Sequence, residues 1–289
     1  QAEDGIRDVE RSRGLGDVYK RQENMLLAID CGNTNTGFAV FDGDSCIGKW
    51  RTSTNANRTA DEYAVWLTQL LALKSLELRD INSIIIANVV PETEFNLQHL
   101  CEQYFCLQPM VVGDKNLNLG IDIHIDEPSE LGADRIVNAI GANDLYKGPL
   151  IVIDFGTATT FDIIESDGSY AGGLIVPGIN LSLEALYNAA SRLPRITIEP
   201  QPKSKTSKDT YSIIGKSTKT AMRSGIFWGY IGLIEGIVER VKAEYKVPMQ
   251  TIATGGLAPV FAGSTTAIEY VDQDITLHGL VLIHKRNSL

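Results

Sequence analysis

Two stretches of this chain follow the same pattern, and their repetition limits what the chain can fold into. Residues 26–44 read LLAIDCGNTNTGFAVFDGD, and residues 151–168 read IVIDFGTATTFDIIESDG. In each, an apolar run ends in an acid, a glycine and several hydroxyl or amide residues follow, and a second apolar run ends at a turn. Such runs predict two paired strands joined by a short loop. We therefore expect each half of the chain to open with the same hairpin.

The segments that follow the two hairpins also correspond. Each half predicts a third strand, then helices that alternate with further strands, and this alternation is typical of an α/β fold. Residues 130–146, 180–191 and 218–245 are among the expected helices, and the several glycines of the last one predict close packing. We therefore expect an α/β fold of two duplicated domains, residues 25–141 and 142–289. Each domain is expected to be a mixed sheet flanked by helices, with a cleft between the two domains.

Residues 1–24 differ from the rest of the chain. The strings QAEDGIRD and SRGLGDVYKRQ match the translation of two parts of a common sequencing-library adaptor. We therefore expect residues 1–24 to be a disordered, non-native leader without function. The protein proper is then expected to begin at Met25, directly before the first strand.

Composition excludes several classes of partner. A net charge of -10 argues against nucleic acid, because phosphate backbones require a basic surface. No apolar run approaches the roughly 18 residues that span a bilayer. The four cysteines form no CxxC pair and the chain shows no secretory signal, so reduced cysteines in a cytoplasmic protein are expected.

The two hairpin loops have the chemistry of a phosphate site. A glycine lets the backbone approach a phosphate closely, and backbone N–H groups and Thr or Asn side chains donate to its oxygens. Asp30 and Asp154, at the strand ends, are suited to hold a cation that bridges to phosphate. A single loop of this kind is common in ordinary hairpins, but two in a duplicated fold predict one triphosphate held between two domains. The turn at Gly255 and Gly256 is either a tight strand-to-helix turn or the floor of an adenosine pocket.

Ten motifs appear in one order along residues 25–283: DCGNTNT, RTSTNANRTADEY, PSELGADR, DFGTATTFD, GGLIVPG, LPR, GKSTKTAMRSG, GYIGLIEGI, TGGLA and ITLHGL. In these motifs the chain resembles the type III pantothenate kinases. The resemblance implies two ribonuclease-H-like domains, as in the superfamily of actin, sugar kinases and chaperone ATPases. It also implies ATP-dependent phosphorylation of pantothenate to 4′-phosphopantothenate, the first step of coenzyme A biosynthesis.

The resemblance further implies roles for individual residues. Asp134 is expected to be the general base, and Arg135 is expected to pair with the pantothenate carboxylate, for which a guanidinium is suited. Asp154 is expected to bind a monovalent cation, K⁺ or NH₄⁺. Asp30 is expected to bind Mg²⁺ through a water molecule. Thr218 is expected to contact the substrate of a neighbouring subunit, which implies a homodimer. The implied ATP-binding residues are Asp30, Cys31, Gly32, Asn33, Thr34, Asn35, Thr36, Gly37 and Thr157, and the implied substrate-binding residues are Gly132, Ala133, Asp134, Arg135 and Thr218.

Two departures from the family pattern concern the substrate pocket. Ile125 occupies a position where the family usually has Tyr, and the segment Gln201–Ser212 belongs to a loop that is longer than in typical relatives. The alternatives are a kinase for another small hydroxylated substrate, such as a sugar or acetate, and a nucleotide-binding accessory protein of transcription. Without the resemblance, Asp134 and Arg135 would also fit a helix-start acid and a surface pair. The presence of Asp30, Asp134, Arg135 and Asp154 together favours the enzyme.

Overall fold

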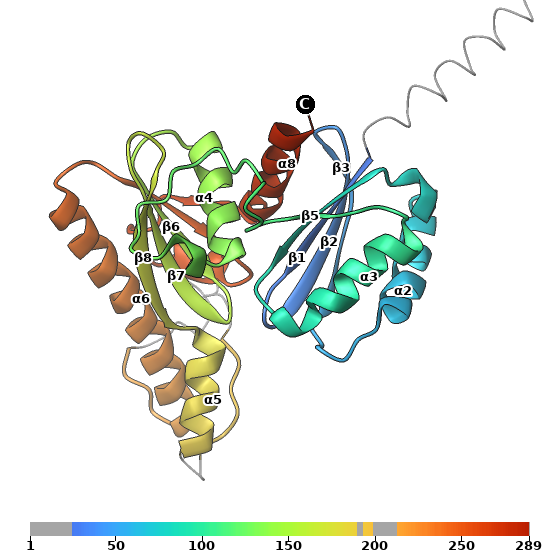
Figure 1. The fold of residues 1–289 in the computed structure, drawn as a ribbon. Coiled ribbons are helices and arrows are strands. Elements are labelled where there is room, and N and C mark those ends of the chain that lie inside the picture. The colour runs from blue at the N-terminus through green and yellow to red at the C-terminus, as the bar shows by residue number, and fades with distance from the viewer. Residues whose placement is uncertain (1–24, 190–192, 199–212, 289) are drawn as a thin grey trace, which may run out of the picture. The chain divides into compact units, whose positions relative to one another are not determined.

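The computed structural model describes residues 25–189, 193–198 and 213–288 (Figure 1). The expected leader and the segment Gln201–Ser212 lie outside these residues. The chain divides into two compact units. The first contains the described residues up to 118 together with 132–134 and 283–288, and the second contains 119–131 and 135–282. The domain boundary that we expect between residues 141 and 142 remains a prediction.

The first unit contains a five-stranded sheet with the strand order β3-β2-β1-β4-β5. Strand β1 pairs antiparallel with β2 and parallel with β4. The expected hairpin is therefore present, and it forms the centre of the sheet. The strands are β1 (Met25–Cys31), β2 (Asn35–Asp42), β3 (Ser45–Ser53), β4 (Ser83–Asn88) and β5 (Met110–Val111).

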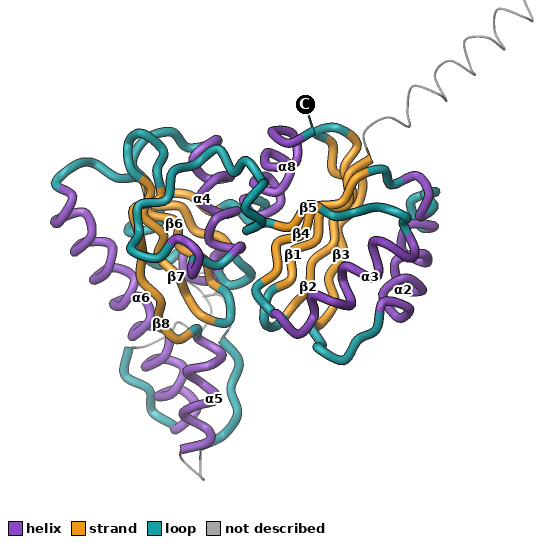
Figure 2. The backbone as a smooth tube through the Cα atoms, viewed as in Figure 1, coloured by secondary structure: helices purple, strands orange, loops and turns teal. Residues whose placement is uncertain are grey.

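The second unit repeats this topology strand for strand. Its sheet has the order β10-β9-β6-β7-β8, in which β6 pairs antiparallel with β7 and parallel with β9. The predicted duplication is thus confirmed, since β6 to β10 take the places of β1 to β5 in the strand order. The strands of both sheets are drawn in orange in Figure 2. The strands are β6 (Leu150–Phe155), β7 (Ala158–Ile164), β8 (Tyr170–Pro177), β9 (Gln250–Thr254) and β10 (Tyr270–Val271).

Two helices of the first unit, α2 (Ala60–Ala72) and α3 (Glu94–Tyr104), pack on one face of its sheet (Figure 1). Helix α2 begins with a capping box in which Thr59 and Glu62 each accept from the other's backbone N–H. The shared core includes Leu27, Ile29 and Cys31 of β1. Because side chains alternate along a strand, Asp30 points to the opposite face. Short 3₁₀ turns lie at Leu78–Asp80 and Pro91–Thr93.

Helices cover both faces of the second sheet. Helices α5 (Ile179–Ala189), α6 (Thr218–Tyr245) and α7 (Ala258–Ala262) share a core with Ile151, Ile153 and Phe161. Helix α4 (Ala133–Leu145) contacts the face that carries Asp154 and Asp162. Helix α8 (Ile275–Asn287) closes the chain. No helix within the described residues combines the length and apolar character needed to cross a bilayer.

Two expectations about helices need correction. The helix expected from residue 130 begins at Ala133, because Pro128–Glu130 forms a separate 3₁₀ turn. The close packing expected at the glycines of α6 is not found at three of them among the described residues. A Cβ placed on Gly225, Gly229 or Gly232 would have no atom of the described residues within 4 Å.

Candidate functional site

The first of the two hairpin loops joins β1 to β2, and backbone hydrogen bonds close it. The N–H of Gly32 donates to the carbonyl of Asn35 at 3.0 Å. Thr54, just after β3, holds the loop from the side, because its N–H donates to the carbonyl of Thr34 at 2.9 Å and its hydroxyl to the carbonyl of Gly32 at 2.6 Å. These hydrogen bonds hold the backbone of the loop in place.

The side chains of this first loop divide into a buried and an exposed set. Cys31 and Thr36 are buried, with 3.5 Å between Sγ and Oγ1, and Cys31 also contacts the hydroxyl of Thr93 at 3.3 Å. These side chains support the loop from the protein interior. Asn33 and Thr34 are exposed, as is Asn35. The exposed set supplies the amide and hydroxyl donors that a phosphate requires.

The second loop, Gly156–Thr157, occupies the equivalent position between β6 and β7. Gly156 N–H donates to the carbonyl of Ala158 at 3.0 Å, and Gly178 N–H donates to the carbonyl of Thr157 at 3.1 Å. A side chain at Gly178 would collide with the carbonyls of both loop residues, so glycine is required there. The side chain of Thr157 is exposed.

Asp154 lies half-buried at the end of β6, and its two carboxylate oxygens have different surroundings. Oδ2 accepts a hydrogen bond from the side-chain amide of Asn138 at 2.9 Å. Oδ1 lies beside Gly255, where a Cβ would be 2.7 Å from Oδ1 and 2.7 Å from the carbonyl oxygen of Phe155. Gly255 has φ +87°, which favours glycine, so this turn is built for close approach to Asp154.

The surroundings of Asp154 fit a hard cation. The missing side chain at Gly255 leaves a carboxylate oxygen and a carbonyl oxygen side by side, and such oxygens are the ligands that alkali and alkaline-earth ions prefer. Within the described residues there is no group of three or more His, Cys, Asp or Glu that could hold a metal ion.

The segment from Gly132 to Arg135 forms the start of α4. Asp134 lies in the first turn of this helix and is half-buried. A Cβ on Gly132 would lie 2.6 Å from Oδ1 of Asp134. Gly132 therefore leaves the space that the Asp134 carboxylate occupies.

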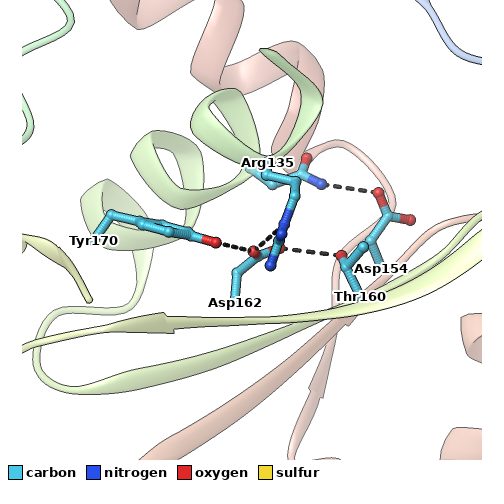
Figure 3. A network of polar contacts seen from close by, with 6 residues as sticks. Arg135, Asp154, Thr160, Asp162 and Tyr170 are labelled. Carbon is cyan, nitrogen blue, oxygen red and sulfur yellow. Dashed lines mark hydrogen bonds and ion pairs between the residues drawn. The ribbon is translucent and has the colours of Figure 1, made fainter. Parts of the chain in front are cut away.

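Arg135 forms an ion pair with Asp162 of β7 (Figure 3). Arg135 Nε donates to Asp162 Oδ1 at 2.6 Å, and the side-chain exposures are 14% for Arg135 and 0% for Asp162. Tyr170 OH also donates to Oδ1 at 2.7 Å, and the hydroxyl of Thr160 donates to Oδ2 at 3.1 Å. Three donors from three elements therefore converge on one buried carboxylate.

Burial has the largest effect on the pKa of the Asp162 carboxyl. Desolvation raises the pKa of Asp162 above its ordinary value, while the Arg135 guanidinium and the hydrogen bonds from Tyr170 and Thr160 act in the opposite direction. The Arg135 guanidinium carbon also lies 5.8 Å from the centre of the Tyr170 ring, within the range of a cation–π contact.

Helix α4 presents Arg135 and Asn138 to the same sheet. They are three residues apart, so they share one helix face, and they contact Asp162 of β7 and Asp154 of β6. The helix that carries the predicted general base is therefore fixed at both points to the second sheet. Among the predicted site residues, Arg135, Asp154, Thr157 and Thr218 belong to the second unit, and the loop from Asp30 to Gly37 and Gly132 to Asp134 belong to the first.

Ile125 lies beside strand β8. The segment before it pairs with Tyr170, which donates its N–H to the carbonyl of Asp122 and accepts from the N–H of His124, both at 2.8 Å. Cγ2 of Ile125 would be 3.9 Å from a Cβ on Gly172. The departure from the family pattern at Ile125 thus lies beside Gly172 of β8.

Thr218 is the first residue of α6 and its side chain is exposed. It lines an open pocket of about 830 Å³ between the end of α5 and the start of α6. The lining residues are Leu186, Leu193, Gly215, Lys216, Ser217, Thr218, Ala221, Met222, Gly225 and Ile226.

The sequence interpretation missed several residues that hold the site together. No role is predicted from the sequence for Asp162, Asn138, Thr54 or Tyr170. One signal was present. The adjacent glycines 172 and 173 interrupt an otherwise apolar strand, and glycine within a strand often marks a close approach of another group.

Comparisons with known proteins agree on one family. Residues 26–240 match the family description "Type III pantothenate kinase". A type III pantothenate kinase of Rhodospirillum rubrum is 57% identical over 264 residues, which cover 91% of this chain and 99% of that protein.

Solved structures with lower sequence identity share the fold. A Campylobacter jejuni protein described as a Baf family transcriptional activator has a TM-score of 0.55 at 22% identity, covering 91% of this chain and 98% of its own. A Sinorhizobium meliloti protein described as a 2-dehydro-3-deoxygalactonokinase has a TM-score of 0.55 at 13% identity. The match covers 91% of this chain and 96% of that protein. At these identities the likeness concerns the fold alone.

Proposed function

This chain belongs to the type III pantothenate kinase family, and we propose that it transfers the γ-phosphate of ATP to the hydroxyl group of pantothenate. The products are 4′-phosphopantothenate and ADP. The observation that carries the proposal is the start of α4, where the carboxylate of Asp134 lies against Gly132 and the guanidinium of Arg135 follows directly. Pantothenate has a hydroxyl that must lose a proton and a carboxylate that a guanidinium can bind.

The two hairpin loops are proposed to bind ATP. Asn33, Thr34 and Thr157 have exposed side chains with hydroxyl or amide donors. In kinases a divalent ion, usually Mg²⁺, accompanies ATP and neutralises the charge on its phosphates. Asp30 at the end of β1 is the group that we assign to this ion, through water.

A monovalent cation, K⁺ or NH₄⁺, is proposed to bind at Asp154. The support is the space left by Gly255 beside Oδ1 of Asp154 and the carbonyl of Phe155. A cation at this position supplies positive charge near the phosphates of ATP. Asn138 keeps the other carboxylate oxygen in place.

Asp134 is proposed to act as general base. It accepts the proton of the pantothenate hydroxyl while the oxygen of that hydroxyl forms a bond to the γ-phosphorus and the bond from that phosphorus to the β-phosphate oxygen breaks. Phosphoryl transfer needs positioning, charge neutralisation and a proton acceptor, and little covalent chemistry from the protein. Arg135 contributes to positioning by pairing with the carboxylate at the other end of pantothenate.

The protein is further proposed to act as a homodimer in which Thr218 contacts the substrate of the neighbouring subunit. Two features of the second unit support an interface. Gly225, Gly229 and Gly232 form part of α6 that no described side chain of this chain covers. Large apolar residues of the same unit are exposed by 36–76%, namely Leu174, Ile175, Leu181, Leu186, Ile213 and Ile214. The cytoplasmic location that the sequence leads us to expect remains a prediction.

The test measures ADP release with ATP, Mg²⁺ and K⁺, with and without pantothenate. We expect turnover that depends on pantothenate, and a loss of about 10²- to 10⁴-fold in kcat for Asp134→Asn. Glu130→Gln, which changes an exposed acid of the preceding 3₁₀ turn, is the matched control and should keep full activity. Folded wild-type protein that ignores pantothenate would favour another hydroxylated substrate, if one restores turnover, or a regulatory nucleotide-binding protein.

A further inference from the structure

We propose that Asp162 is a positioning residue for Arg135, and that the fixed guanidinium sets the preference of this site for a substrate that carries a carboxylate. The inference rests on the proposed function, because it concerns the arginine that binds the pantothenate carboxylate. It adds Asp162 and Tyr170 to the groups that determine substrate choice. Neither residue needs to touch the substrate.

Burial shows how Asp162 must act. Its side chain is fully buried, whereas 14% of the Arg135 side chain remains exposed. A ligand in solution can therefore reach part of the Arg135 side chain, though not its buried terminal nitrogen Nη2, and cannot reach Asp162. Any influence of Asp162 on the substrate must be transmitted through the guanidinium.

The hydrogen bonds of Asp162 fix the plane of that guanidinium. Nε of Arg135 donates to Oδ1, and Oδ1 is itself held by Tyr170 OH while Oδ2 is held by Thr160. Since the carboxylate cannot rotate without breaking these bonds, the Nε–H direction is set. A guanidinium is rigid and planar, so fixing Nε also fixes its two terminal nitrogens.

The sheet provides the space for this arrangement. Gly173 of β8 is the cross-strand partner of Asp162, so the two positions share one face of the sheet. A Cβ on Gly173 would collide with the terminal nitrogen Nη2 of Arg135. The guanidinium therefore lies between the Asp162 carboxylate and the bare backbone of β8, in the place that a side chain would otherwise fill.

The charge of Asp162 has a second effect. With Asp162 ionised, the Asp162–Arg135 pair has no net charge, so it attracts a distant anion weakly. Binding of a carboxylate to Arg135 then depends on short, directional hydrogen bonds and hence on correct geometry. A neutral carboxamide of the same shape offers one acceptor oxygen in place of two and should bind poorly. A guanidinium that is loosely held loses this discrimination.

The test compares pantothenate with its carboxamide analogue in wild type, Asp162→Asn and Tyr170→Phe, using the full chain. Asp162→Asn keeps the side-chain size and one acceptor oxygen but removes the charge. Tyr170→Phe keeps the ring and removes only the donor to Oδ1, so it should fold like the wild type even if Asp162→Asn does not. The control is Glu239→Gln, which alters an exposed acid of α6.

We expect the KM for pantothenate to rise at least tenfold in Asp162→Asn and about threefold in Tyr170→Phe, with kcat and the KM for ATP nearly unchanged. Loss of binding that is equal in the ground and transition states has this kinetic form. The ratio of kcat/KM for pantothenate to that for the carboxamide should fall in the same order. A general loss of structure would lower kcat and would not change this ratio.

The possible failures are distinguishable. If wild type shows no pantothenate-dependent turnover, the proposed function is wrong and the inference falls with it. If wild type is active and both folded variants keep the wild-type KM and the wild-type preference for the carboxylate, only the inference is overturned. If Asp162→Asn does not fold, Tyr170→Phe alone decides between these outcomes.

Discussion

The side-chain amide of Asn138 donates a hydrogen bond to Oδ2 of Asp154, with 2.9 Å between nitrogen and oxygen. Asn138 is buried, and its own carbonyl oxygen accepts from the hydroxyl of Thr276 at 2.7 Å. Helix α4, strand β6 and the start of α8 therefore meet through one amide. This contact leaves Oδ1 of Asp154 facing Gly255, where we propose a monovalent cation.

Replacing this amide should weaken both the fold and the cation response. Asn138→Leu keeps the volume but leaves an oxygen of Asp154 without its donor, which should cost about 1–3 kcal/mol in the free energy of unfolding. The K⁺ concentration for half-maximal activity and the rise of Tm on adding K⁺ test the second effect. We expect the first to increase and the second to shrink.

The matched control for Asn138→Leu is Thr276→Val, which removes only the hydroxyl that binds the far side of the amide. It should lower the free energy of unfolding by about 0.5–1.5 kcal/mol and leave the K⁺ response almost unchanged. An unchanged K⁺ response in folded Asn138→Leu would argue against a cation at Asp154.

Gly255 and Gly256 are adjacent, but only the first should be sensitive to substitution. Gly255→Ala places a methyl group 2.7 Å from Oδ1 of Asp154 at a backbone with φ +87°. We expect a loss of about 1–3 kcal/mol in unfolding free energy and a weaker response to K⁺. Gly256→Ala meets no atom of the described residues within 4 Å and should change the stability by less than about 0.5 kcal/mol. Urea denaturation of both variants checks the difference.

Ile125→Tyr should increase the affinity for pantothenate. Ile125 lies beside Gly172, and the family usually has Tyr at this position, so a ring at 125 is expected to restore the aromatic contact that the resemblance implies. We expect the KM for pantothenate to fall severalfold, with little change in kcat or in the KM for ATP. Ile125→Val, which keeps an aliphatic side chain, is the control. An equal or higher KM in folded Ile125→Tyr would show that position 125 does not contact the substrate.

The strand order was predictable because the repeated pattern of each hairpin lies within one short stretch of the sequence. The hairpins around Asp30 and Asp154 have alternating or continuous apolar patterns, and these patterns determine both strand length and pairing. The start of α4 was placed three residues early, because Pro128 favours a turn of its own before the helix. Helix ends depend on such local competition and are harder to predict than strands.

The contacts of the site were less predictable than its residues. Asp162 and Arg135 are distant in the sequence, and nothing in a strand pattern distinguishes a buried acid with three donors from an exposed one. The glycines of α6 predict close packing, but no described atom lies within 4 Å of a Cβ placed on Gly225, Gly229 or Gly232. Contacts with a second chain leave the same sequence pattern as contacts within one chain.

The four cysteines should separate into two reactive and two protected thiols. Cys46 and Cys106 are exposed, whereas Cys31 and Cys101 are buried. Burial raises the pKa of the Cys101 thiol to about 12, so it has almost no thiolate near pH 8. We expect two thiols to react promptly with Ellman's reagent in the native protein and four in denaturant. Cys46→Ser should lower the prompt count to one, and a prompt third thiol in the native wild type would contradict the burial.

Gly132 should be as important for turnover as the base that it accommodates. A methyl group at position 132 would lie 2.6 Å from Oδ1 of Asp134, so Gly132→Ala must move the carboxylate or the start of α4. Since a general base must stay within hydrogen-bond reach of its proton, we expect kcat to fall by at least tenfold. Gly263→Ala, at an exposed position where a Cβ meets no described atom within 4 Å, is the control and should keep full kcat. Full kcat in Gly132→Ala would mean that the Asp134 carboxylate does not need its present position, and would weaken its assignment as the base.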